Sequence, residues 1–355
     1  MAGQFYTTVA GRLEKYPGRI LKKAEKREML TKLGAMDPMP KNKSQTIVWL
    51  RFLPYGGVDN QWIAAGGDTA YISAHLIGEG VTPSADSVTY TTISATLQQI
   101  GCLYSYTDKT AYVHEEGQEI PREMEDQTAQ RLALCREMMV YGEMKSCTNQ
   151  FFGGTGTTVG TVNGAPTKAH LQNISRALLG KHAIMLNQML KSGPRFGMQS
   201  VAASWPIYCH TDMEKTYENL TGFTKVQDYG GREFLDPEYE IGAIGRFRVI
   251  VNPILTFLPH EGAAVGATGL KSSDATNIDV YPQIIVGRGL GGGDAFGQVP
   301  LRGSESVNVS HIPPSTKTKS DPLGQRGYVG AATWQAQKVL NDAWMAVYFT
   351  GTEAN

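Results

Sequence analysis

Residues 54–87 constrain the fold more than any other part of this sequence. They separate a strand-like segment, residues 46–54, from a second strand pattern over residues 87–114, and they contain eight glycines or prolines. A structureless loop of that length is unusual inside a compact domain. The alternative is a projecting two-stranded ribbon, which is barely stable alone in water. If the rest of the chain does not cover such a ribbon, a neighbouring copy must.

Charge is segregated along a chain whose total is balanced. The 355 residues include 33 Lys and Arg against 33 Asp and Glu, so the formal net charge is zero. Residues 1–43 hold ten basic and four acidic residues (10 − 4 = +6), which leaves −6 for the remainder. Residues 52–108 contain five acidic residues and neither Lys nor Arg. A basic arm is therefore followed by an acidic, glycine-rich segment.

The basic arm has three interpretations. It is a solvated helix face, a contact with nucleic-acid phosphates, or a contact with an acidic partner. No aromatic residues alternate with the basic residues in a way that would indicate base stacking. For the third interpretation, the segment over residues 52–108 of another copy is the obvious candidate, because it has no positive charge.

Cysteine and histidine spacing gives no metal or catalytic signature. The four cysteines contain no C-x-x-C pair, and the seven histidines are scattered without the spacing of a zinc site. His210 and Asp212 could share a proton, but their place in "YCHTDMEKTYENL" favours a helix cap. Neither a signal peptide nor an apolar run long enough to span a bilayer is evident, so a reducing cytoplasm and free thiols are expected. The sequence predicts no catalytic residue, no cofactor and no metal.

Periodicity predicts a long helix over residues 117–146. Acidic residues crowd its start, where the helix dipole favours them, and an apolar stripe recurs every three to four residues. The stripe consists of Met124, Thr128, Leu132, Cys135 and Met139. Further helices are expected over residues 167–190 and 211–220. Strands are expected in the segments "EIGAIGRFRVIVNPIL", "DVYPQIIVG" and "SVNVSHI", and at the end of "TWQAQKVLNDAWMAVYFTG".

Two glycine motifs raise the possibility of nucleotide binding. Gly287, Gly289 and Gly292 have the G-x-G-x-x-G spacing after a strand-like run. A dinucleotide site needs a helix to begin there, but Gly297 and Pro300 follow too soon for a helix of any length. The "GGTGTT" segment over residues 153–158 lacks the lysine of a phosphate loop. Both motifs are interpreted as glycine-rich loops.

Several longer motifs are specific enough to compare with known protein families. They are "EGVTP" after the ribbon, "QQIGCLYSYTD" with Ile100 in a tyrosine position, "YEIGAIGRFRVIV", residues 280–297, and "DPLGQRGYVGAATWQAQKVLNDAW" over residues 321–344. The chain resembles, from about residue 41 to 348, the tailed-phage major capsid proteins typified by that of coliphage N-four, which have the Hong Kong 97 fold. It differs from this family in the extra glycines of "GRGLGGG". These glycines fit a lengthened loop.

The resemblance implies an α+β fold with a division of the chain into five parts. These are an N-terminal arm (1–45), an extended β-hairpin loop and its stem (46–105), a peripheral domain with a spine helix (106–149), an axial domain (150–325), and a C-terminal segment returning to the peripheral domain (326–355). The implied function is self-assembly into hexamers and pentamers of an icosahedral head around double-stranded DNA. The protein would be no enzyme and would assemble in the bacterial cytoplasm into the virion. Decoration, scaffold and portal proteins are possible partners, and a membrane is not.

A cargo-loaded nanocompartment of encapsulin type is the alternative function, and a nucleotide-dependent enzyme is less favoured. For the capsid function, three groups of residues are candidates for the assembly interface. They are the loop residues Trp62, Ile63, Tyr71, Ile72, Leu76 and Ile77, the arm residues Lys22, Lys23, Lys26 and Arg27, and an acidic counter-surface of Asp59, Asp68, Glu79 and Asp86.

Overall fold

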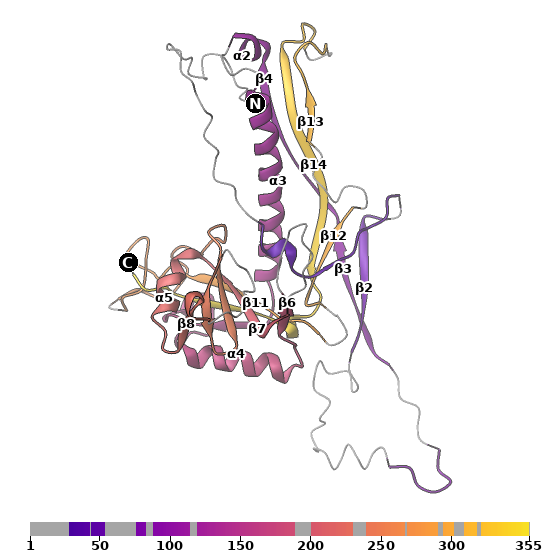
Figure 1. The fold of residues 1–355 in the computed structure, drawn as a ribbon. Helices are drawn as coiled ribbons and strands as arrows, with labels where there is room; N and C mark the ends of the chain where they lie inside the picture. Colours follow the sequence, from indigo (N-terminus) through magenta and orange to yellow (C-terminus); the bar gives the residue numbers. More distant parts are fainter. Residues whose placement is uncertain are drawn as a thin grey trace. The chain divides into compact units, whose positions relative to one another are not determined.

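A computed structural model describes residues 28–42, 44–53, 76–82, 88–113, 119–188, 200–229, 239–266, 268–289, 294–301, 309–317 and 321–354 (Figure 1). The chain divides into two compact units. The first comprises Met1–Ile47, Ala95–Val140 and Gln298–Gln337, and the second comprises Val48–Ser94, Tyr141–Gly297 and Lys338–Asn355. Both helices and sheets contribute, which confirms the expected α+β class.

The first unit is organised around a five-stranded sheet. Its strand order is β1 (Ala35–Met36), β12 (Phe296–Pro300), β14 (Arg326–Val339) and β13 (Val309–Ile312), and β4 (Gln98–Thr107) also pairs with β14. The antiparallel β4–β14 ladder is long, from Arg326 opposite Thr107 to Gln335 opposite Gln98. A short helix, α2 (Asp108–Val113), follows β4 directly. The strand pattern expected over residues 87–114 was therefore wrong at its end.

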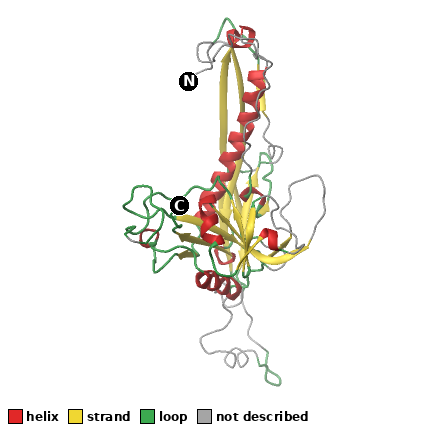
Figure 2. Cartoon of the chain, turned by 60° about the vertical axis from the view of Figure 1, so that its left-hand side comes forward, coloured by secondary structure: helices red, strands yellow, loops and turns green. Residues whose placement is uncertain are grey.

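The longest helix is α3 (Glu119–Lys145), which confirms the helix expected over residues 117–146. Helix α3 runs beside the long strands of the first unit (Figure 2). Met124 of α3, Tyr106 of β4 and Val329 of β14 form a small buried cluster there. Burial of Met124, Thr128 and Leu132 confirms the first half of the expected stripe.

The second half of that stripe differs from the expectation. Cys135 is exposed, whereas Glu137 is fully buried. The Glu137 carboxylate accepts hydrogen bonds from the backbone N–H groups of Met29, Leu30 and Thr31 at 3.0, 2.8 and 3.1 Å. Those residues begin a single 3₁₀ turn, Leu30–Lys32, whose first N–H groups have no partner within the turn. An ionisable residue is thus buried because it satisfies backbone donors that would otherwise have no partner.

The second unit is built on an eight-stranded mixed sheet. Its order is β5 (Gln150–Phe152), β15 (Met345–Thr350), β11 (Tyr281–Val286), β7 (Ser200–Cys209), β10 (Phe247–Val251), β9 (Glu240–Ile244) and β8 (Phe223–Lys225), and β6 (Leu186–Gln188) also pairs with β7. Strands β7 and β10 are parallel, and so are β5 and β15. Every residue of β10, β11 and β15 is buried. Such continuous burial along a strand is typical of a sheet covered on both faces.

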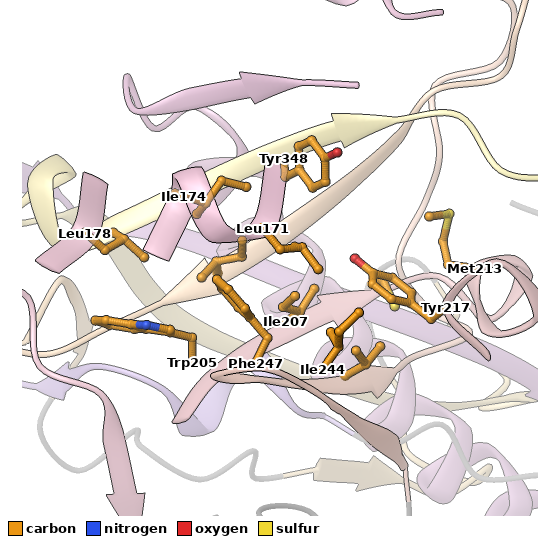
Figure 3. Packing of buried hydrophobic residues seen from close by; sticks show 14 of the residues in the cluster. Leu171, Ile174, Leu178, Trp205, Ile207, Met213, Tyr217, Ile244, Phe247 and Tyr348 are labelled. Carbon is orange, nitrogen blue, oxygen red and sulfur yellow. The ribbon is translucent and has the colours of Figure 1, made fainter. Parts of the chain in front are cut away.

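Helix α4 (Lys168–Gly180) covers part of this sheet. The Thr167 hydroxyl caps it by accepting a hydrogen bond from the backbone N–H of His170. Its buried side chains, Leu171, Ile174 and Leu178, belong to the main core cluster of the second unit, which Figure 3 shows together with Trp205, Ile207, Met213, Tyr217, Ile244, Phe247 and Tyr348. The helix ends at Gly180, well before the expected end at residue 190. His182 then takes a left-handed conformation with φ 58°, which turns the chain out of the helix.

The C-terminal part of the chain contributes to both units. Strand β14 lies in the sheet of the first unit, while β15 pairs with β11 and β5 in the second. Short helical segments at Thr211–Met213 and α5 (Glu214–Glu218) confirm the helix expected over residues 211–220. Among the described residues, no helix combines the length and apolarity needed to cross a bilayer.

Candidate assembly surface

A separate two-stranded sheet, β2 (Thr46–Phe52) and β3 (Tyr90–Thr96), forms the stem on either side of residues 54–87. The Leu53 N–H donates to the Thr89 carbonyl at 3.0 Å, and the Leu97 N–H donates to the Gln45 carbonyl at 2.9 Å. Because these partners run in opposite order, the two strands are antiparallel. The strand expected over residues 46–54 is confirmed, and it is half of a hairpin stem.

One face of this hairpin carries uncovered apolar side chains. On β2 they are Val48 (59% exposed), Leu50 (52%) and Phe52 (63%), which share a face because successive strand residues alternate. Tyr90 of β3 adds to the face, and the rings of Phe52 and Tyr90 lie 6.4 Å apart in an edge-on arrangement. Val88, just before β3, is also exposed. We call Val48, Leu50, Phe52, Val88 and Tyr90 the hairpin face.

The opposite side of β2 contacts its own chain. Arg51 points to that side, and its guanidinium donates to the Leu340 carbonyl at 3.2 Å. Trp49, two residues earlier on the same side, is half-buried. The hairpin therefore has one side satisfied within the subunit and one apolar side left in solvent. Uncovered apolar patches of this kind mark interaction sites.

Residues 76–82 form a second exposed apolar element. Leu76 (73% exposed), Ile77 and Val81 are all in solvent, and Glu79 between them is exposed as well. The Val81 N–H donates to the Gly78 carbonyl at 3.1 Å, which closes a tight turn. Gly80 has φ 78°, a conformation that favours glycine. The turn therefore presents Glu79 at its apex with apolar side chains beside it.

The structure reaches only part of the interface predicted from the sequence. Leu76, Ile77 and Glu79 are described and exposed. Outside the described residues lie Trp62, Ile63, Tyr71, Ile72, Asp59, Asp68, Asp86, Lys22, Lys23, Lys26 and Arg27. Sequence reasoning missed the hairpin face, although the alternation in "TIVWLRF" places Val48, Leu50 and Phe52 on one side of a strand.

The glycine motif that suggested nucleotide binding serves packing. A Cβ on Gly287 would collide with the Trp205 ring, and one on Gly289 would collide with the Trp344 ring. The element after this loop is strand β12, which begins at Phe296, so no helix of the described residues offers its N-terminus to a phosphate there. These glycines allow the backbone to approach two tryptophans closely.

The "GGTGTT" loop is also closed on itself. The Thr155 N–H donates to the Asn163 side chain at 2.9 Å, and the N–H groups of Thr157 and Thr158 both donate to the Thr161 hydroxyl at 3.0 Å. A phosphate loop needs such N–H groups to point at its ligand. Here the loop's own side chains accept their hydrogen bonds.

The ionisable groups near His210 have structural roles. The His210 ring accepts a hydrogen bond from the Asp212 N–H at 3.1 Å, which confirms the predicted helix cap. Burial is the main cause that lowers the pKa of His210. The Asp212 carboxylate accepts from Lys271 at 2.6 Å and from the Tyr281 hydroxyl at 2.8 Å. Although burial alone would raise the pKa of Asp212, these hydrogen bonds and the neighbouring positive charge lower it. Among the described residues, no group of His, Cys, Asp and Glu could hold a metal ion.

Solved structures of phage capsids overlap this chain along nearly its whole length. The capsid of Ralstonia phage GP4 has a TM-score of 0.62 at 9% identity, covering 96% of this chain and 95% of that chain. The Cyanophage Pam1 capsid has a TM-score of 0.60 at 12% identity, with 100% of both chains covered. The Cyanophage P-SCSP1u capsid has a TM-score of 0.58 at 12% identity, covering 99% and 98%. The chain has a Hong Kong 97-like capsid fold.

Sequence similarity to the capsid proteins is weaker than the structural similarity. The chain is 24% identical over 160 residues to the major capsid protein of Pseudomonas phage KPP21, and the match covers 41% of this chain and 38% of that protein. The matched part is thus less than half of the relative's length. No protein-family model matches the chain. Among the described residues that flank or belong to segment 54–87, the hairpin face and the turn over residues 76–82 both carry exposed apolar side chains.

Proposed function

We propose that the chain is the major capsid protein of a tailed bacteriophage, which self-assembles into hexamers and pentamers of an icosahedral head around double-stranded DNA. The observation that carries the proposal is the uncovered hairpin face on a capsid fold. Fully burying an apolar side chain of this size contributes about 1.5–3 kcal/mol relative to leaving it exposed, so covering a half-exposed one contributes roughly half as much. A subunit that presents several of them on a two-stranded sheet gains its stability by meeting another copy.

The division of the chain in the assembled shell is part of this proposal. Residues 1–45 form the arm, 46–105 the extended loop and stem, 106–149 the peripheral domain, 150–325 the axial domain, and 326–355 the C-terminal segment. The long β4–β14 ladder beside α3 supports a peripheral domain built around a spine helix. The mixed sheet of the second unit supports an axial domain over the first part of 150–325. Strands β12 and β13, although within 150–325, belong to the sheet of the first unit, and β15 of the C-terminal segment belongs to the sheet of the second.

The finer assignment is to the branch typified by the coliphage N-four protein. The motif "DPLGQRGYVGAATWQAQKVLNDAW" supports it, together with residues 280–297. We further propose that the protein has no catalytic activity, since its curated and structural relatives are capsid proteins. It would assemble in the host cytoplasm into the virion, with decoration, scaffold and portal proteins as possible partners.

We propose that the basic arm docks on an acidic surface of a neighbour. The candidates are the acidic residues of segment 52–108 and the glutamates at the start of α3, such as Glu119 and Glu123. Such pairing weakens with added salt, because screening shortens the reach of exposed charges. Charge reversal at Lys22, Lys23, Lys26 and Arg27 should therefore reduce assembly. A variant that assembles normally but packages DNA poorly would assign the arm to DNA.

Electron microscopy of the purified protein tests the function directly. Wild-type protein should form large closed shells, whereas Leu50→Asp with Phe52→Asp should leave soluble capsomers or monomers. Thr91→Asp is the matched control, because Thr91 is exposed on β3 but lies on the other side from Tyr90. Small shells that carry protein cargo would indicate a nanocompartment instead. A wild-type protein that stays monomeric at high concentration would contradict the proposal.

A further inference from the structure

A groove of about 610 Å³ lies between helix α4 and the turn that joins β9 to β10. Its apolar lining includes Leu171 and Leu179 from α4, and Ile244 and Phe247 from the two strands. That volume is within the range of roughly 300–1,000 Å³ that binding pockets occupy. The groove is therefore large enough to accept a few side chains of a partner.

Three cations surround the groove, and they differ from the other basic residues of this unit. Lys168, Arg176 and Arg246 line it, and none of them has an ion pair or side-chain hydrogen bond to any described residue. Every other Lys or Arg described in the second unit contacts a carboxylate, an oxygen acceptor or an aromatic ring. These partnered residues are Arg51, Lys145, Lys181, Lys215, Lys225, Arg248, Lys271, Arg288 and Lys338.

The sequence around α4 contains nothing that could neutralise these cations locally. Residues 144–211 include no Asp or Glu at all. The complementary bias occurs in residues 52–108, which contain five acidic residues and no Lys or Arg. A chain of zero net charge thus has one long segment without acids and another without bases. This segregation favours pairing between the two segments.

The turn over residues 76–82 carries the negative charge that the groove lacks, next to apolar side chains that match the lining of the groove. It presents one exposed carboxylate, Glu79, between exposed apolar side chains, Leu76, Ile77 and Val81. The groove offers cations around an apolar lining. In a single subunit the turn stays in solvent, so its own groove does not hold it. If such a turn fills the groove, it therefore comes from a second copy.

We propose that the turn over residues 76–82 of one subunit seats in the α4 groove of another, with Glu79 against the Lys168, Arg176 and Arg246 cluster and Leu76 and Ile77 on the apolar lining. The inference rests on the proposed shell function and adds the site that receives the loop. DNA is the competing occupant. Phosphate recognition needs positive charge alone, whereas this groove also offers apolar surface. If Glu79 binds in this groove, the acidic sites that remain for the basic arm are the start of α3 and the other acidic residues of segment 52–108.

A zero-length crosslink tests this contact in assembled shells. A carbodiimide converts the Glu79 carboxyl group to an O-acylisourea. The Lys168 amine attacks the carbonyl carbon of this ester, forms an amide bond and releases the carbodiimide as a urea. Shells grown from a mixture of ¹⁵N-labelled and unlabelled subunits should yield Glu79–Lys168 peptides with one labelled and one unlabelled half. Glu79→Gln should abolish this product. Intact shells without it would overturn the inference, while failure of the wild type to form shells would overturn the proposed function instead.

A charge exchange tests the same contact by assembly. Arg176 and Glu79 are both exposed, so their replacement leaves folding intact. Glu79→Arg or Arg176→Glu places like charges together and should lower shell yield about tenfold or more, since like charges across an interface are strongly unfavourable. The double exchange should restore the yield, and Arg176→Lys should retain it. Normal assembly of Arg176→Glu with loss of retained DNA would assign the groove to DNA and overturn the proposal.

Discussion

The hairpin β2–β3 and the strands β10, β11 and β15 are similar in sequence chemistry but opposite in burial. Both are rich in β-branched, aromatic and other apolar residues. All side chains of the three core strands are buried, whereas Val48, Leu50 and Phe52 on the hairpin are more than half exposed. Since apolar burial drives folding and association alike, the core strands stabilise the subunit, and in the proposed assembly the hairpin stabilises a contact between subunits.

This contrast predicts that mutations separate into two phenotypes. Changes in the core should lower the free energy of unfolding of the single subunit. Changes on the hairpin face should leave that free energy nearly unchanged and lower assembly. A substitution that does both, or neither, would show that the division is wrong.

The largest effect is expected for Ile285→Ala in β11. Ile285 is fully buried in the main core cluster of the second unit. The substitution should lower the free energy of unfolding by about 2–5 kcal/mol, because it removes apolar contacts and leaves a cavity. Urea unfolding of the unassembled subunit measures this, and Ile285→Val should cost only about 0.5–1.5 kcal/mol. Equal values for the two variants would mean that this strand is loosely packed.

The next effect concerns the buried Glu137. Glu137→Gln leaves one oxygen to accept from three backbone N–H groups, so we expect a loss of about 1–3 kcal/mol for each donor left unpaired. Burial is the main cause that raises the pKa of Glu137 above its ordinary value of 4.5, although the three N–H groups act in the opposite direction.

The pH dependence of this loss follows from the raised pKa. The folded protein holds the Glu137 proton more tightly than the unfolded chain does. Stability from this group is therefore fully present below pH 4.5 and is lost as the pH rises through the folded pKa. In urea unfolding, the difference in free energy of unfolding between wild type and Glu137→Gln should become smaller from acidic to neutral pH. A gap that widens would mean that the N–H groups outweigh burial.

A third prediction compares two glycines with opposite surroundings. Gly289→Ala should destabilise the subunit by about 1–3 kcal/mol, because its Cβ would overlap the Trp344 ring. Gly142→Ala in helix α3 has nothing within 4 Å of the added carbon, and it should stabilise by about 0.5–1 kcal/mol. Thermal unfolding of both variants checks the opposite signs. A stabilised Gly289→Ala would contradict the tight packing of that loop.

The smallest effect on folding is expected at the hairpin face. Leu50→Ser should change the free energy of unfolding by no more than about 0.5 kcal/mol, because more than half of that side chain is already in solvent. Phe52→Ser should cost about 0.5–1.5 kcal/mol, because it also loses the ring contact with Tyr90. Their shell yield should nevertheless fall sharply, as measured by sedimentation of the assembly reaction. Unchanged assembly in the double variant would remove the hairpin face from the interface.

Much of the fold could be predicted from local patterns. The apolar spacing and acidic start of α3 identified that helix, and the long motifs near the C-terminus indicated the capsid fold. The pattern failed where a tertiary contact decided the outcome. Glu137 is buried only because the backbone of Met29–Thr31 meets it, a contact between residues far apart in the chain. Periodicity within a helix carries no information on such a partner.

The sequence predicted the kind of candidate site, an apolar loop outside the core, but not which residues form it. Residues 54–87 indicated an extended loop because no pattern there could build a core. The hairpin face and the α4 groove depend on which apolar side chains remain uncovered after folding, and this follows from packing across the chain. The sequence also does not distinguish a paired cation from an unpaired one. Lys271 reaches Asp212, which is distant in the chain, whereas Arg176 reaches no described carboxylate.

Strand β15 has a consequence for synthesis of the protein on the ribosome. It pairs with β11 on one side and β5 on the other, so it completes the interior of a sheet whose other strands are translated earlier. A nascent chain that has not reached Thr350 leaves one edge of β11 without its partner strand and cannot close its core. Prematurely terminated chains should therefore be recognised by chaperones and proteases, which would remove defective subunits before they accumulate.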